Sequence, residues 1–218
     1  KQPFTPKNEN GKLYGLGSND AGASLVSLFQ VYRHLSMTTQ SYNLIFLASC
    51  EEEVSGKNGI ESVLPQLPPI ALGVVGEPTE MQPAIAEKGL MVLDVTARGK
   101  SGHAARNEGE NAIYKLLPDI EWFRTYKFPK ESPILGPVKM SVTQINAGTQ
   151  HNVIPDLCSI VVDIRSNECY SNEELFAEIC QHIQSEAKAR SFRLNSSSIP
   201  SDHPFVKRAI ELGKVPFG

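Results

Sequence analysis

The sequence lacks several features that would assign it to a specialised class of protein. Its four cysteines are few for 218 residues and include no C-x-x-C pair: Cys50, Cys158, Cys169 and Cys180. A secreted chain held by disulfides would more often show paired, clustered cysteines. We therefore expect a cytoplasmic protein with buried, reduced thiols.

Long apolar runs and a strong net charge are also absent. The longest run, residues 44–48, has the length of a strand and is too short to span a bilayer, and residues 1–4 contain no apolar signal core. The formal net charge is −3, with Lys and Arg dispersed among acids, which gives no electrostatic basis for binding nucleic acid. We expect neither a membrane nor a nucleic-acid partner.

Up to about residue 84, the hydrophobic pattern alternates between helix and strand. Residues 23–35 place apolar side chains on one helical face, and residues 57–64 predict a second, short helix. Continuous apolar runs at 42–50 and 71–75 predict strands buried on both faces. This alternation predicts a doubly wound α/β domain with a mostly parallel sheet, in which active sites gather at the C-terminal ends of strands.

After residue 85 the pattern changes to a smaller unit. Period-two alternation and apolar runs predict strands at 90–97, 138–146, 157–165 and 192–195, and amphipathic spacing predicts helices at 111–126 and 173–190. Ser171 and Glu174 form an expected capping box for the second helix.

The order βαββαβ is that of a ferredoxin-like split βαβ sandwich, a unit that can be inserted in a larger domain. Residues 196–200 predict a linker, and residues 202–212 predict a helix. We assign residues 1–84 to part of a catalytic domain, 85–199 to the inserted domain, and 200–218 to the return into the catalytic domain.

Acidic side chains follow the predicted strands and turns of the first part. Asp20 follows a glycine-rich turn, residues 51–53 are all Glu, and Glu77 precedes a proline. Carboxylates in a partly desolvated cleft repel one another unless a cation neutralises them, and two metal ions about 3.5–4 Å apart would do so. Simpler alternatives are an N-cap for Asp20, a solvated first helical turn for the Glu triplet, and an exposed turn for Glu77.

Six short blocks occur in a fixed order along the chain: Gly15-x-Gly17-x-x-Asp20, Glu51-Glu52-Glu53-x-x-x-x-Asn58-Gly59, Gly76-Glu77-Pro78-Thr79, Gly99-Lys100-Ser101-Gly102-His103-Ala104-Ala105, Asn152-Val153-Ile154-Pro155 and Asp163-Ile164-Arg165. With these blocks the sequence resembles the dinuclear zinc metallopeptidases that include aminoacylases, glutamate carboxypeptidases, succinyl-diaminopimelate desuccinylases and acetylornithine deacetylases. The resemblance covers nearly the whole chain.

The resemblance implies a role for each carboxylate. Asp20 would bridge two zinc ions, for which cobalt can substitute. Glu53 would ligate one ion and Glu77 the other, and Glu52 would be the general base that takes a proton from the bridging water. Glu51 aligns with the acid that precedes this pair, and the resemblance gives it no role.

The resemblance further implies that the βαββαβ unit is a lid through which the protein forms a homodimer. His103 would reach the active site of the partner subunit and stabilise the oxyanion, and Asn152 would help to orient the substrate. Arg165 would hold a substrate carboxylate. Outside the motif, His103 is a loop histidine near a strand end, and Arg165 could make an internal salt bridge instead.

Within this family the segments 51–59, 106–112, 150–155 and 167–170 are most similar to acetylornithine deacetylase-type sequences. The implied reaction is hydrolysis of an Nα-acyl group, acetyl or succinyl, from ornithine in arginine biosynthesis. A succinyl substrate would need a further cationic contact, which spacing alone does not identify. The alternatives are a succinyl-diaminopimelate desuccinylase or another acyl-amino-acid deacylase or dipeptidase, and, in a different class, a non-catalytic dimerising homologue.

The family pattern also requires two histidine ligands, one in a His-x-Asp segment before the Asp20 block and one near the end of the catalytic domain. Neither pattern occurs in the 218 residues. We therefore expect an internal segment of a longer enzyme, in which the metal site is incomplete.

We predict that residues 1–218 alone have little or no amidohydrolase activity, because three carboxylates without imidazole ligands bind zinc weakly. Hydrolysis of Nα-acetylornithine in the presence of added zinc or cobalt measures this. Robust turnover would show that the ligand set assigned above is wrong.

Overall fold

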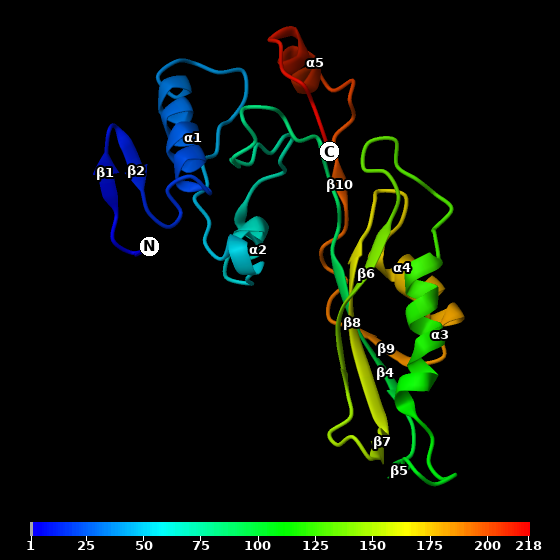
Figure 1. Ribbon diagram of the computed structural model, residues 1–218. Coiled ribbons are helices and arrows are strands. Elements are labelled where there is room, and N and C mark those ends of the chain that lie inside the picture. Colours follow the sequence, from blue (N-terminus) through cyan, green and yellow to red (C-terminus); the bar gives the residue numbers. More distant parts are fainter. Residues whose placement is uncertain (1) are drawn as a thin grey trace. The chain divides into compact units, whose positions relative to one another are not determined.

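The computed structural model describes residues 2–218, which divide into two compact units after Met81. Both units mix helices and strands, so the predicted α/β class is confirmed (Figure 1). Within the described residues, no helix is both long enough and apolar enough to cross a bilayer.

The first unit is built from short elements. They are the strands β1 (Lys7–Glu9) and β2 (Lys12–Tyr14), the α-helices α1 (Gly22–Leu35) and α2 (Ile60–Val63), and two 3₁₀ turns, η1 (Glu52–Val54) and η2 (Leu64–Gln66). Helix α1 is where the sequence predicts it. Helix α2 is shorter than predicted, because the chain tightens into η2, which has a proline in its first turn.

Strands β1 and β2 form an antiparallel hairpin that the sequence analysis did not predict. Its two-residue turn consists of Asn10 and Gly11, whose φ angles are 53° and 73°. Left-handed backbone at both positions is what a type I′ turn requires, and Asn-Gly is the pair that adopts it most readily.

The predicted strands at 42–50 and 71–75 are wrong for this structure, since neither segment lies in a strand. A buried parallel strand is held by ladder hydrogen bonds from neighbours on both sides, and no segment within residues 2–218 supplies them. The apolar side chains of these segments consequently remain accessible: Ile45 is 47% exposed and Val75 80%. The doubly wound sheet is therefore not formed within the first unit.

Helix α1 and the segment after it form the main apolar contact of this unit. The ring of Phe46 lies 5.3 Å from that of Phe29 and 5.8 Å from that of Tyr32. Leu25, Val26, Phe29, Phe46 and Ala48 line an apolar hollow of about 270 Å³.

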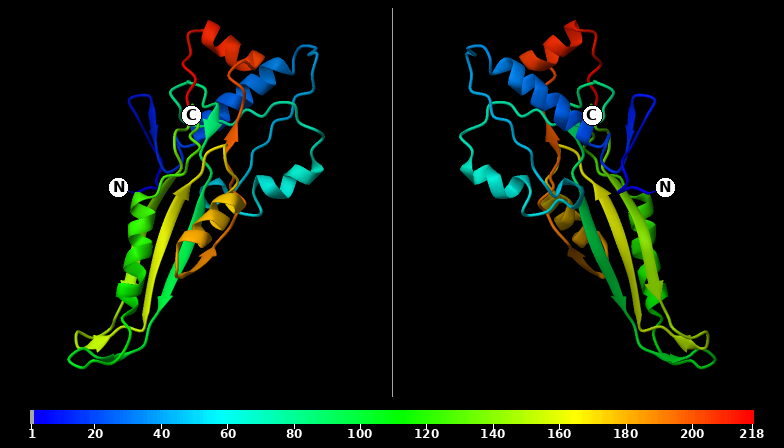
Figure 2. Two further views of the ribbon diagram at one scale, coloured as in Figure 1. Left: turned by 90° about the vertical axis from the view of Figure 1, so that its right-hand side faces the viewer. Right: turned by 90° about the vertical axis from the view of Figure 1, so that its left-hand side faces the viewer.

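The second unit contains a four-stranded antiparallel sheet in the order β6-β8-β4-β9. Its strands are β4 (Met91–Arg98), β6 (Lys139–Ala147), β8 (Leu157–Arg165) and β9 (Glu186–Ala189). The helices α3 (Ala112–Thr125) and α4 (Asn172–His182) cover one face of this sheet (Figures 1 and 2). The predicted βαββαβ order is confirmed.

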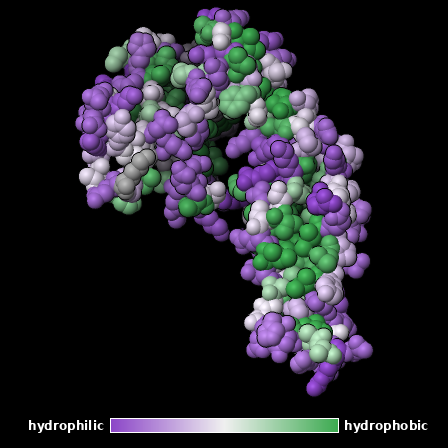
Figure 3. All heavy atoms as spheres, in the orientation of Figure 1, coloured by the Kyte–Doolittle hydropathy of each residue, from purple (hydrophilic) through white to green (hydrophobic). Residues whose placement is uncertain are grey.

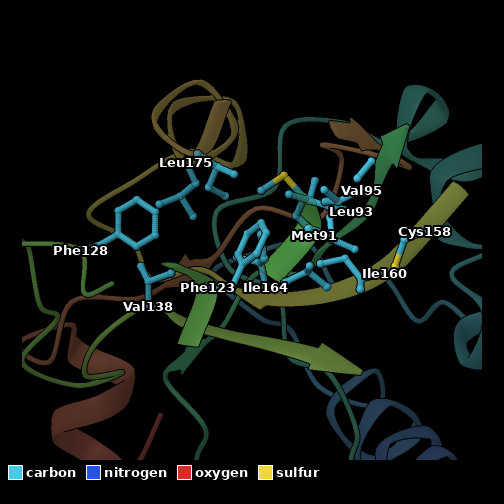
Figure 4. Close-up of a cluster of buried hydrophobic side chains, with 14 of the residues drawn as sticks. Met91, Leu93, Val95, Phe123, Phe128, Val138, Cys158, Ile160, Ile164 and Leu175 are labelled. Atoms are coloured by element: carbon cyan, nitrogen blue, oxygen red, sulfur yellow. The ribbon is translucent and has the colours of Figure 1, made fainter. Parts of the chain in front are cut away.

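The core of the second unit follows from the period of two along its central strands. Every second residue of β4 and β8 is buried, from Met91 to Ala97 and from Cys158 to Ile164. These side chains meet Phe123 of α3 and Leu175 of α4 (Figure 4). Because side chains alternate between the faces of a strand, the other half of each strand forms the uncovered face of the sheet.

The thiols differ in their burial. Cys158 is fully buried in this core, and burial raises the pKa of its thiol. Cys50 and Cys180 are exposed, so the expectation that the thiols are buried is wrong for these two. All four cysteines are free.

Helix α4 ends at His182, eight residues before its predicted end, and residues 186–189 form β9. The capping box of Ser171 and Glu174 at its start is confirmed. Two contacts overcome the helical propensity of the segment 186–189: pairing with the edge of β4, and the buried carboxylate of Asp119. That carboxylate accepts hydrogen bonds from the backbone N–H groups of Gln184 and Ser185, both at 3.0 Å. The last strand predicted at 192–195 is therefore wrong in position.

A narrow ribbon and a terminal helix complete the second unit. Strand β3 (Ala86–Glu87) pairs with β10 (Ser197–Ser198), so part of the predicted linker is a strand. Helix α5 (Pro204–Glu211) begins after His203, whose Nδ1 accepts a hydrogen bond from the Phe205 N–H.

Buried Asn172 ties the base of the sheet to this ribbon. Its side-chain amide donates to the carbonyl oxygens of Leu90, Phe192 and Leu194, at 3.4, 3.3 and 2.9 Å. Its side-chain oxygen accepts from the hydroxyl of Ser166 at 2.9 Å. One side chain thus joins the chain that enters the sheet to the chain that leaves it.

We predict that Asp119→Ala lowers the free energy of unfolding of the second unit by about 2 kcal/mol, because Asp119 is only 2% exposed and its removal leaves two backbone donors without an acceptor. Urea unfolding followed by the fluorescence of Trp122, the single tryptophan, measures this. The matched control is Glu121→Ala on the exposed side of α3, with a much smaller loss expected because its ion pair with Arg124 is solvated. Equal losses would contradict the role given to Asp119.

Candidate active site

Asp20 lies exposed in the turn before α1. The N-cap of α1 is Ala21, and no side chain caps the helix. The alternative that Asp20 serves as an N-cap is therefore wrong, and the structure gives its carboxylate no local structural role of that kind.

Glu51, which the family resemblance left without a role, shapes the loop that carries Glu52 and Glu53. Its carboxylate accepts from the backbone N–H and the side-chain amide of Asn58, at 3.1 and 3.0 Å. A Cβ at Gly56 would lie 2.0 Å from Glu51 Oε2, so this approach requires glycine. Glu52 and Glu53 are left exposed in η1.

The three predicted metal ligands are not gathered into one site. Asp20, Glu53 and Glu77 are all exposed, and within residues 2–218 no three His, Cys, Asp or Glu side chains lie together as a metal site would require. The desolvated cleft expected from the sequence is likewise not formed. As arranged here these residues do not fit a pair of metal ions, and the ligand assignment stays a prediction.

His103 and Asn152 are brought together at the tip of the second unit. Strand β5 (Gly102–His103) pairs with β7 (Val153–Ile154), which places His103 opposite Val153. The next N–H, that of Ala104, donates to the carbonyl of Asn152 at 3.0 Å. Both His103 and Asn152 are exposed, so the tip presents two polar side chains to solvent.

A local hydrogen bond determines which nitrogen of His103 carries the proton. The Ala105 N–H donates to Nδ1 at 3.2 Å, so Nδ1 accepts with its lone pair and carries no proton. In the neutral imidazole the proton is then on Nε2, which becomes a donor. A donor at an exposed tip can stabilise the oxyanion of a tetrahedral intermediate.

Backbone hydrogen bonds that the sequence did not reveal hold the two segments of the tip, residues 99–105 and 152–155. The carbonyl of Pro155 accepts from the Ala112 N–H at 2.9 Å, at the start of α3, where Asn111 is the N-cap. Lys100 and Glu110 exchange both backbone hydrogen bonds, at 2.9 and 2.8 Å. Because these bonds fix the loop to a helix end, the geometry around His103 is set by the fold.

Arg165 makes the internal salt bridge that the sequence analysis held as an alternative. Its Nε and one terminal nitrogen donate to both carboxylate oxygens of Asp163, at 2.8 and 3.1 Å. The two residues lie two apart on β8 and so share the uncovered face of the sheet. The Arg165 side chain is 47% exposed, and its role toward a substrate stays a prediction.

Residues 85–191 match the family model described as the peptidase dimerisation domain. An acetylornithine deacetylase from Proteus mirabilis is 30% identical over 174 residues, which cover 76% of this chain and 44% of that protein. A succinyl-diaminopimelate desuccinylase from Paracidovorax citrulli is 29% identical over 182 residues, covering 77% of this chain and 46% of that protein. The chain spans about half the length of the curated relatives it matches.

Solved structures share the fold. A tripeptidase from Staphylococcus aureus aligns with 98% of this chain and 61% of its own, at a TM-score of 0.66 and 17% identity. The aminopeptidase PepT from Bacillus cereus aligns with 97% of this chain and 61% of its own, at a TM-score of 0.63 and 19% identity. The chain therefore belongs to the metallopeptidase family of acetylornithine deacetylases and succinyl-diaminopimelate desuccinylases, with residues 85–191 as its peptidase dimerisation domain.

Proposed function

We propose that this chain provides carboxylates and the lid of a cytoplasmic amidohydrolase that removes an acetyl or succinyl group from the Nα of ornithine. Relatives at about 30% identity are named for two substrates, acetylornithine and succinyl-diaminopimelate, so they support the class of acyl-amino-acid deacylase more strongly than ornithine itself. The observation that carries the proposal is the lid tip, where His103 presents an Nε2–H donor beside Asn152.

In this proposal each residue acts at one stage of amide hydrolysis. Glu52, exposed in η1, takes a proton from the attacking water and passes it to the leaving amine. His103 donates from Nε2 to the oxyanion as the carbonyl becomes tetrahedral, and Asn152 orients the substrate. Asp20, Glu53 and Glu77 are proposed ligands of two zinc or cobalt ions, whose site would also need imidazole ligands that the described residues do not bring.

The length of the sheet supports a homodimer in which the lid serves the partner subunit. Strand β8 has nine residues, so about 27 Å separates the end near the lid tip from Arg165 at the other end. A substrate the size of a dipeptide spans at most about 7 Å. One molecule therefore cannot contact His103 and Arg165 of the same chain, and we propose that these two contacts come from different copies.

The proposed dimer surface is the outer edge of β6 with the neighbouring side of α3. Strand β6 ends the sheet, and its Ile145 is 56% exposed on the face that the helices cover. On α3, Tyr114 and Leu117 are 70% and 51% exposed. Figure 3 shows apolar side chains gathered on this side of the second unit. An unpaired strand beside apolar side chains is suited to pairing with a second copy.

Two other functions remain as alternatives. One is a related enzyme, either a succinyl-diaminopimelate desuccinylase or another deacylase or dipeptidase. The identity levels support the desuccinylase as well as they support the acetylornithine deacetylase. The other is a non-catalytic dimerising homologue. Glu52 argues against the second, because a scaffold needs no general base in a loop shaped by Glu51 and Asn58.

A panel of Nα-acyl amino acids, assayed with the native-length protein and added zinc or cobalt, tests the proposal. We expect hydrolysis of Nα-acetylornithine or Nα-succinylornithine. If both are inert while another acyl amino acid is hydrolysed, the ornithine assignment fails and the related deacylase is favoured. If none is hydrolysed and metal analysis finds no bound ion, the non-catalytic homologue is favoured.

We predict that His103→Ala, which removes the N–H donor, lowers kcat of the native-length enzyme by about 10²–10³-fold with little change in KM, because an oxyanion donor acts mainly in the transition state. Steady-state kinetics on the best substrate of the panel measure this. His151→Ala changes an exposed histidine of the same tip and is the matched control, with near-normal kcat expected. A normal kcat for the His103 variant would refute the donor role.

We predict that Ile145→Asp weakens dimerisation by about 100-fold or more, because it places an unpaired charge in the interface. Light scattering over a range of protein concentrations measures the dimer fraction. Leu212→Asp, at an apolar position of the second unit that is 63% exposed outside the proposed surface, should leave the dimer intact. A dimer unaffected by the Ile145 change would place the interface elsewhere.

A further inference from the structure

The uncovered face of the sheet carries three basic side chains at one end. Lys139 of β6 lies directly across from Arg165 of β8. Gly89 and Ser166 exchange both backbone hydrogen bonds, at 3.1 and 3.2 Å, so the pairing of β4 with β8 continues past the named strands. Lys88 is three residues before the buried Met91 and therefore lies on the face opposite to it, the same face as Lys139 and Arg165.

Positive charge is in excess at this end of the sheet. Among residues 2–218, the carboxylate paired there is that of Asp163, and both of its oxygens are already bonded to Arg165. Within residues 2–218, neither Lys88 nor Lys139 has a carboxylate partner, and Lys88 Nζ donates instead to the carbonyl of Pro137 at 3.2 Å. Partial burial, and then the charge of Lys139, lower the pKa of the Lys88 ammonium. The two ammonium groups are thus close enough to repel each other.

The excess is local, because Arg190 and Arg98 of the same sheet lie beside carboxylates and Lys188 lies across from Asp94. Arg190 bonds both oxygens of Asp94, at 2.7 and 3.0 Å, across the pairing of β9 with β4. Arg98 lies 3.9 Å from Glu186. Holding two like charges together costs folding free energy. A bound anion would remove that cost, and the three residues lie on the same face of neighbouring strands, which are about 4.8 Å apart.

We propose that Lys88 and Lys139 bind the carboxylate at the far end of a dicarboxylic acyl group, while Arg165 binds the α-carboxylate of the same substrate. This inference rests on the proposed deacylase function and selects between its two substrates. Nα-succinyl amino acids carry the second carboxylate and Nα-acetyl amino acids lack it, so the surface formed by Lys88, Lys139 and Arg165 favours the succinyl group.

Binding of succinate to the full 218-residue chain, measured by calorimetry at low salt, tests this surface without requiring catalysis. Succinate should bind more tightly than acetate, which offers one carboxylate, and added salt should weaken it. Lys88→Gln and Lys139→Gln should each weaken succinate binding by about three- to fivefold. Lys139→Arg keeps the charge and should retain binding. Lys188→Gln removes an exposed lysine of β9 and is the matched control, with unchanged affinity expected.

The outcomes separate this inference from the function on which it rests. Equal binding of acetate and succinate, or no loss in either glutamine variant with its thermal unfolding unchanged, overturns the surface even if the native-length protein is a deacylase. Loss of succinate affinity in both glutamine variants but not in Lys188→Gln supports it. If the native-length protein then hydrolyses no acyl amino acid, the proposed function fails while the anion-binding surface stands.

Discussion

The second unit depends on the burial of alternate side chains from two central strands against two helices. From Met91 to Ala97 on β4, and from Cys158 to Ile164 on β8, one face of each strand is removed from water. A shift of register by one residue would expose that whole set, so the pairing is strongly specified. That register also positions the residues with a proposed function in this unit. The lid tip lies near the start of β8, and Arg165 lies at the end of β8.

Where the sequence pattern and the packing depend on the same residues, prediction from sequence succeeded. Strand β8 occupies the predicted range 157–165, and α3 and β4 lie within one or two residues of theirs. Prediction failed where the structure of a segment depends on a partner that is distant in the sequence. The segment 186–189 has helical propensity but pairs with β4, and the apolar segment 42–50 has no neighbouring strand within the described residues. The Asn10-Gly11 dipeptide is a sequence signal for the β1–β2 hairpin, and this signal was overlooked.

The candidate site shows the same division. Motif order selected His103 and Asn152 as candidates, and the β5–β7 pairing places them side by side, while their roles stay predictions. Sequence could not show that the Ala105 N–H determines the proton position of the imidazole, or that Glu51 shapes the loop that carries Glu52, since both depend on backbone geometry. The carboxylates were chosen by their motifs alone, and their assembly requires a cleft that the first unit does not form.

The amide of Asn172 has a mechanical consequence. It donates hydrogen bonds to the carbonyl of Leu90 on the chain entering the sheet, and to those of Phe192 and Leu194 on the chain leaving it. A force that pulled these two chain segments apart would have to stretch this amide bridge together with the direct hydrogen bond from the Leu90 N–H to the Leu194 carbonyl, at 2.8 Å. Bonds loaded in parallel resist more than bonds broken in turn. Bending of the β3–β10 ribbon should therefore deform the chain outside this junction, and the sheet and the helices that cover it should move as one rigid body.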